Sequence, residues 1–133
     1  MKYRIDPNIN VKLRQLREQE AEIEEARERE EERRITEISK IVHRTFINCI
    51  DYIRERLPND KKKQEYLAKE VSKMLAKAQP FGFMGDDESE LMSFSKDFIE
   101  IIIMITETKT DIGYMRRDPR EAMSFIMDIR EEL

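Results

Sequence analysis

The chain has 133 residues, of which 41% are charged and 39% hydrophobic, with only 3 glycines and 4 prolines. This length suits one ordinary domain, and the shortage of turn-forming residues argues against a strand-rich fold and favours long amphipathic helices. The net charge is -4, but residues 35–80 are basic and residues 81–133 are acidic. That asymmetry is typical of solvated helix faces, and it also suits pairing between segments or the steering of a partner.

A single cysteine, Cys49, lies in an apolar stretch, so the sequence has no disulfide framework and the residue is predicted to be a small core side chain. The first residues lack the apolar region of a signal peptide. The longest apolar run, from Phe98 to Ile105, is interrupted by Glu100 and is too short to span a bilayer. We therefore expect a soluble, cytoplasmic protein that has no membrane-spanning segment.

A long helix is predicted from about Pro7 to Leu57, because Asp6-Pro7 suits a helix start and no breaker follows until Pro58. Near its start, apolar residues alternate at four- and three-residue spacing, with Glu20 at the intermediate position. These residues are Ile9, Leu13, Leu16 and Ile23. The pattern predicts a narrow seam for another helix and makes Leu13, Leu16 and Ile23 candidate partner-binding residues.

The segment from Glu24 to Arg34 is almost entirely charged and contains acid-before-base pairs four residues apart, such as Glu30 with Arg34. Such pairs keep a helix formed without burying any of its faces. After Arg34 the pattern changes to a broad apolar stripe that continues to Leu57 and needs a partner surface. We therefore divide the chain into a charged helical arm, residues 1–34, and a compact helical bundle, residues 35–133.

Pro58 ends the long helix, and Asn59 or Asp60 is expected to cap a second helix that Pro80 ends. The loop that follows, residues 81–85, contains two glycines and is rich in aromatic residues. An apolar loop of this kind either packs back onto the core or forms a contact surface. Under the second alternative, Phe81, Phe83 and Met84 are candidate partner-binding residues.

Asp87 and Glu90 form a capping box for a third helix. Its β-branched stretch, residues 98–105, also fits a buried strand, but the sequence offers no second convincing strand to pair with it, so length and capping favour a helix. Thr106, Thr108 and Thr110 weaken helix propensity near the end of this helix, which is expected to span residues 87–108, and Gly113 can terminate it. A last helix begins at Asp118-Pro119, where a capping residue precedes a proline at the first helical position.

No motif indicates a catalytic centre, a metal or a cofactor, since the chain has neither a glycine-rich phosphate loop nor a zinc-type spacing of cysteine and histidine. His43 is predicted to be a hydrogen-bonded packing residue, because no carboxylate lies at the helical spacing that metal sites use. Glu100 is expected to be paired or exposed. A pocket lined by both would instead favour an enzyme.

Two basic clusters are candidate anion-binding sites. The first is Lys61, Lys62 and Lys63 at the start of the second helix, and the second is Arg116, Arg117 and Arg120 beside the start of the last one. Lysines on an exposed helix face are usually only a solvated surface. The acidic surroundings of the arginines also argue against nucleic acid as the ligand.

The sequence therefore predicts an all-α protein, a bundle of about four helices with a long charged N-terminal helical arm. The favoured function is that of a non-enzymatic assembly or interaction protein, acting as a homo-oligomer or with a protein partner through the arm. A small structural component, connector or assembly chaperone of a virus or phage would have this organisation, and so would a bacterial adaptor. The alternative is a helical module that binds a small anionic ligand or nucleic acid.

Overall fold

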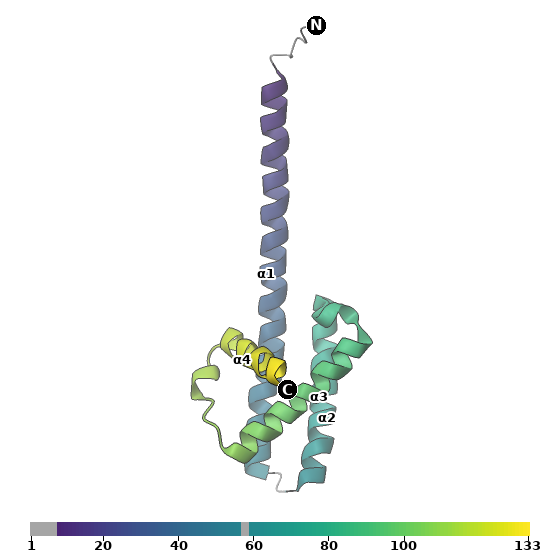
Figure 1. Cartoon of the computed structure of the whole chain (residues 1–133), viewed down its shortest axis with the longest axis vertical. Helices are drawn as coiled ribbons and strands as arrows, with labels where there is room; N and C mark the ends of the chain where they lie inside the picture. Colours follow the sequence, from purple (N-terminus) through teal and green to yellow (C-terminus); the bar gives the residue numbers. More distant parts are fainter. Residues whose placement is uncertain (1–7, 57–58) are drawn as a thin grey trace. The chain divides into compact units, whose positions relative to one another are not determined.

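The computed structural model describes residues 8–56 and 59–133 and confirms the all-α prediction (Figure 1). Within these residues there are four α-helices and no strand. The helices are α1 (Ile9–Arg56), α2 (Asp60–Ala78), α3 (Glu88–Thr108) and α4 (Pro119–Glu132), with the short 3-10 helices η1 (Gln79–Phe81), η2 (Phe83–Asp86) and η3 (Gly113–Met115) between them. The chain divides into two units, Met1–Arg34 and Ile35–Leu133, which we describe separately.

The first unit consists of the part of α1 that precedes Ile35, and nearly all of its described residues are exposed. Ion pairs form here between residues three apart: the Arg33 guanidinium lies 2.6 Å from Glu30, and that of Arg34 lies 2.5 Å from Glu31. The expected four-residue pair of Glu30 with Arg34 is therefore replaced by a three-residue one. The predicted helix start at Asp6-Pro7 lies outside the described residues.

The second unit is a helical bundle in which the rest of α1 supplies one side of the core. The predicted apolar stripe is buried along α1 in Ile38, Val42, Phe46, Cys49, Ile50 and Ile53. Helix α3 packs against both α2 and α4. Aromatic rings form the centre, since the ring centroid of Phe98 lies 5.9 Å from that of Phe46 and 5.6 Å from that of Phe94. Because these side chains exclude water together, the bundle has one continuous core.

The predicted capping residues begin the helices of the bundle. The Asn59 side chain accepts the backbone N–H groups of Lys61 and Lys62 at the start of α2. Asp87 and Asp118 do the same at the starts of α3 and α4. Helix α2 ends at Ala78, immediately before the turn that contains Pro80, as expected. The other half of the predicted α1–α2 turn, residues 57–58, is outside the described residues.

Helix α3 settles the ambiguity of residues 98–105, which are helical throughout. The helix ends at Thr108, as expected, and Lys109 adopts the left-handed conformation, with φ 55°, directly after it. The backbone N–H groups of Lys109 and Thr110 both donate to the carbonyl of Ile105. A C-terminal turn of this kind usually contains glycine, so the lysine there was not predictable as a stop signal.

The aromatic loop after α2 packs partly into the core. Phe83 is 4% exposed and meets Phe94 edge-on, with ring centroids 4.9 Å apart. Left-handed backbone at four residues of this loop bends the chain sharply enough to turn Phe83 inward: Gly82, Met84, Gly85 and Asp86. Phe81 and Met84 are half-buried. The first of the two alternatives therefore fits this loop, and the assignment of Phe83 to a partner surface is corrected.

Candidate partner-binding site

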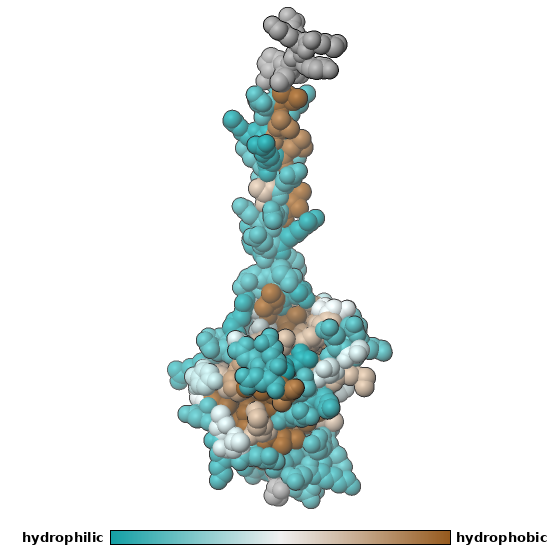
Figure 2. Space-filling view, viewed as in Figure 1, coloured by the Kyte–Doolittle hydropathy of each residue, from teal (hydrophilic) through white to brown (hydrophobic). Residues whose placement is uncertain are grey.

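The described part of the arm has a row of exposed apolar side chains, which we call the seam: Ile9, Leu13, Leu16 and Ile23. Their exposed fractions are 40%, 46%, 55% and 54%. Figure 2 shows apolar side chains gathered along one side of this helix, with hydrophilic residues around them. Single exposed apolar residues are ordinary on any protein surface, but a row at seam spacing on one helix is typical of a helix-binding face. The partner-binding candidates Leu13, Leu16 and Ile23 thus lie together.

Charges on the arm are ordered along the helix. From Ile9 to Arg17 the only charged residues are the cations Lys12, Arg14 and Arg17. From Glu18 to Glu25 the only charged residues are the carboxylates Glu18, Glu20, Glu22, Glu24 and Glu25. We call these segments the basic block and the acidic block. The blocks are adjacent and opposite in charge, so the charge of the described arm changes from positive to negative along the helix that also has the apolar seam.

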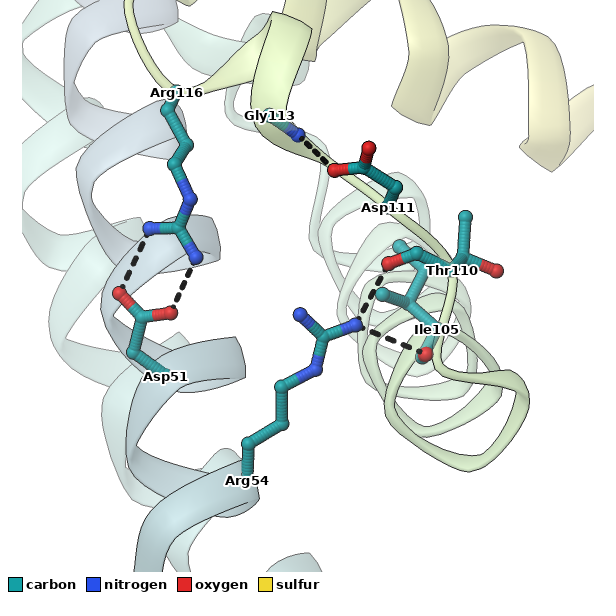
Figure 3. A network of polar contacts seen from close by, with 7 residues as sticks. All are labelled: Asp51, Arg54, Ile105, Thr110, Asp111, Gly113 and Arg116. Atoms are coloured by element: carbon teal, nitrogen blue, oxygen red, sulfur yellow. Dashed lines mark hydrogen bonds and ion pairs between the residues drawn. The ribbon is translucent and has the colours of Figure 1, made fainter.

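The arginine cluster at η3 and α4 is held by contacts inside the bundle rather than gathered around a ligand site. Arg116 donates to both carboxylate oxygens of Asp51, at 3.0 and 2.7 Å (Figure 3). This hydrogen bonding and the positive charge lower the pKa of Asp51. Arg120 donates to the Thr36 hydroxyl at 2.9 Å, and Arg117 is exposed. Two of the three predicted anion-binding arginines therefore tie the start of α4 to α1.

A basic cleft lies where α1 and α3 end and α2 begins, with a volume of about 710 Å³. It is lined by Arg54, Arg56, Lys63 and Lys109, together with Ile53, Glu55 and Thr106. Arg54 donates to the backbone carbonyls of Thr110 at 2.7 Å and of Ile105 at 3.5 Å (Figure 3). Cations beside the carbonyl ends of helices stabilise those ends. Of the predicted lysine cluster only Lys63 lines this cleft, while Lys61 and Lys62 lie on the exposed surface of α2.

Sequence reasoning missed this cleft because its residues come from three elements separated along the chain. The available signal was the basic character of helix ends, in Arg54 and Arg56 in the last turn of α1 and in Lys109 after α3. That signal does not by itself indicate a cleft, because carbonyl ends of helices collect cations for structural reasons alone.

His43 has the packing role predicted for it. Its Nε2 atom lies 2.8 Å from the backbone carbonyl of Met115, which joins α1 to η3. His43 also lines a shallow cavity of about 300 Å³ with Lys40, Arg44 and Pro119 among its other walls, but Glu100 is not among them. Glu100 is exposed on α3, in accordance with the second of its two expected environments.

Cys49 is a core residue, as expected, and 1% of its surface is exposed. Burial, together with the nearby charge of Glu70, raises the pKa of its thiol to about 12. The thiol is accordingly kept protonated and shielded from reagents at neutral pH.

Across the described ranges, 8–56 and 59–133, no group of three or more metal-binding side chains comes together. None of the helices in that part of the chain has the length and apolar character required to cross a membrane. Comparisons with protein families, with curated proteins and with solved structures find no match to this chain.

Proposed function

We propose that this protein is a non-enzymatic assembly protein that acts as an oligomer, in which the arm binds another helix and the bundle supplies a stable folded body. The observation that carries the proposal is the seam, whose four apolar side chains are each at least 40% exposed. The apolar faces of the bundle helices, by contrast, are covered by one another. The seam is the apolar helix face in the described chain that still lacks a covering surface.

The energetics of the arm support the same interpretation. Pairs such as Glu30 with Arg33 each stabilise a helix by roughly 0.2–0.5 kcal/mol, so the charged part of the arm has no need of apolar residues to remain helical. Burying a leucine or isoleucine side chain contributes about 1.5–3 kcal/mol. The seam therefore gains stability only when another surface covers it, and a helix with the same spacing is the surface that fits.

The test uses the full chain and measures its mass in solution over a range of concentrations by sedimentation equilibrium. We expect an oligomer that dissociates on dilution. We expect Leu16→Glu to make the protein monomeric, because it replaces an apolar contact of the seam with a second carboxylate beside Glu20, and burying that charge is costly. Val11→Glu is the matched control, since Val11 is 53% exposed, close to the 55% of Leu16, but lies on the opposite side of the helix. It should leave the mass unchanged.

Circular dichroism should show the same helix content in both variants, because each replaces an exposed residue. A monomeric full chain at high protein concentration would overturn the proposal. The same holds for an oligomer that both variants leave intact.

A second candidate function, the binding of a small anion, is favoured by the basic cleft. Its cations Arg56 and Lys63 would contact a phosphate-like ligand, and the affinity would fall steeply with salt. Titration calorimetry with inorganic pyrophosphate tests this, using Arg56→Gln as the cleft variant and Lys77→Gln, on the exposed surface of α2, as the control. Equal heats for the two variants would exclude the cleft as the binding site.

A further inference from the structure

We infer that the partner of the seam is the seam of a second copy of this chain, bound in the antiparallel orientation with the two helices crossing near Glu18. The inference rests on the proposed function, because it presupposes that the arm binds a helix. It adds the identity of that helix, its direction and its register. The described arm provides three observations for it: the place of Glu20, the order of the charged blocks, and the point at which the seam ends.

The position of Glu20 is the first observation. At about 100° per residue, the four seam residues and Glu20 all fall within an arc of about 80° on one side of the helix. Glu20 therefore belongs to the same face as Leu16 and Ile23, and another helix on that face must contact it. In a parallel, in-register pair each Glu20 would meet the Glu20 of the second copy. Two carboxylates facing each other in an apolar contact are strongly unfavourable.

The antiparallel arrangement removes this conflict. With the crossing point at Glu18, Glu20 faces Leu16 of the second copy, and Leu13 faces its Ile23. Each of these contacts then occurs twice, with the two copies exchanging roles, as a two-fold symmetric interface requires. The Glu20 carboxylate lies within the contact, on the side that faces the segment of the second copy that contains Arg17. A single polar residue in such a seam commonly sets orientation and register, at some cost in affinity.

The order of charges is the second observation. In the antiparallel arrangement, the basic block of each copy lies along the acidic block of the other. Of these charges, Lys12 and Arg17 in the basic block and Glu20 and Glu24 in the acidic block lie nearest the seam, whereas the others point away from it. A parallel pair would place Lys12 and Arg17 beside the same cations of the second copy. It would also place the two acidic blocks together. Electrostatic complementarity of this kind selects orientation, and it identifies the chain's own arm as a matching partner.

The end of the seam is the third observation. Beyond Ile23 the positions that continue the spacing are Arg27, Glu30 and Arg34, and all three are charged. The contact is thus confined to the segment from Ile9 to about Arg27, a length of about 28 Å per helix. So short a contact gives a weak, reversible dimer, one that forms at micromolar concentrations and above.

The test measures distances between nitroxide labels by double electron–electron resonance in the full chain. Single cysteines replace residues on the face of the arm opposite the seam, in the variants Val11→Cys, Glu18→Cys and Glu25→Cys. The native Cys49 is buried, so the unsubstituted chain serves as the labelling blank. The mass of every labelled chain is measured in the same samples, which establishes that each is a dimer.

The antiparallel pair places the two labels at residue 18 at the same position along the helix axis, on opposite outer faces of the pair, so that only the lateral distance separates them. It separates the labels at residue 11, and likewise those at residue 25, by about 21 Å along the helix axis in addition to their lateral distance. We therefore expect the shortest of the three distances for Glu18→Cys and two longer distances, similar to each other, for Val11→Cys and Glu25→Cys.

Three similar distances would show a parallel pair. They would overturn this inference while leaving the proposed function in place. A monomeric mass for the unlabelled full chain would overturn the proposed function itself. A dimer that persists in Leu16→Glu would place the contact outside the seam and would overturn both.

Discussion

The pair of Asp51 with Arg116 should behave as a structural link between α1 and η3, and a double-mutant cycle measures its strength. The perturbations are Asp51→Asn, Arg116→Gln and the two combined. The two side chains are 40% and 41% exposed, so water and salt screen the pair, which makes its bidentate geometry the main reason to expect any coupling. Exposed pairs of this kind contribute about 0.2–1 kcal/mol, and we expect about 0.5–1 kcal/mol here.

The assay is urea unfolding of the four proteins at pH 7 and low ionic strength. The coupling free energy is the change in unfolding free energy of the double variant minus the sum of the changes of the two single variants. The folded structure lowers the pKa of Asp51 below its unfolded value of about 3.9, so the pair stabilises the fold above that pH. The contribution is lost as the pH falls through the folded pKa. It should also shrink at high salt, because screening acts on partly exposed charges.

Arg117 provides the control, since it is an exposed neighbour of the same charge in the same turn. The cycle of Asp51→Asn with Arg117→Gln should give a smaller coupling than the cycle with Arg116→Gln. Equal couplings in the two cycles would refute the assignment of Arg116 to a structural pair. So would a coupling that does not decrease as the pH is lowered from about 3.9, the unfolded pKa of an aspartate. If phosphate abolished the coupling at constant ionic strength, Arg116 would belong to the alternative anion site after all.

Two further predictions concern the bundle. Phe98→Ala should lower the free energy of unfolding by about 3–5 kcal/mol, because Phe98 is fully buried between Phe46 and Phe94. The control is Met92→Ala on the same helix. Because Met92 is 74% exposed, this substitution should change the free energy of unfolding by less than about 0.5 kcal/mol. Similar losses in urea unfolding would contradict the packing of α3. Lys109→Gly should stabilise the protein by about 0.5–1 kcal/mol, because it removes a side chain from a residue with left-handed backbone. The control, Lys69→Gly inside α2, should destabilise the protein by about 1 kcal/mol, because glycine is unfavourable within a helix. A lower unfolding midpoint for Lys109→Gly would count against the left-handed conformation.

The bundle was predictable from sequence wherever local chemistry determines structure. Asn59, Asp87 and Asp118 each cap the helix that the sequence assigned to them. The apolar spacing of α1 also identified most of its buried residues, because a helix face that is apolar at three- and four-residue intervals must be covered. Ile35, at the start of the predicted stripe, is instead 37% exposed. Pro80 ended α2 for a reason that depends on one residue alone, the loss of a backbone donor.

What the sequence did not show depends on contacts between distant segments. Helix α3 ends at Thr108, as expected, but the side chain that donates to the carbonyls of Ile105 and Thr110 at this end is Arg54 from α1, 51 and 56 residues away from them in the chain. The inward turn of Phe83 likewise depends on Phe94, and local composition does not distinguish a buried aromatic loop from an exposed one. The same limit applied to Arg116, which looked like an anion ligand until Asp51 was found beside it, 65 residues away in the chain.

The seam differs from these cases, because the surface proposed to cover it is not part of the same folded chain. A helix stabilised by its own charges, as in the segment around Glu30 and Arg33, would stay soluble with polar residues at every position. Leu16 and Ile23 are instead exposed at more than half of their surface. Glu20 lies between them on the same face, where a leucine would bind another helix more strongly but would not favour one orientation of that helix. A wholly apolar seam would associate with many apolar helices. A seam that contains one carboxylate favours a helix that has both an apolar residue and a cation opposite that carboxylate. In the proposed pairing, the residue that most weakens the arm as an apolar surface is therefore the one that selects the partner.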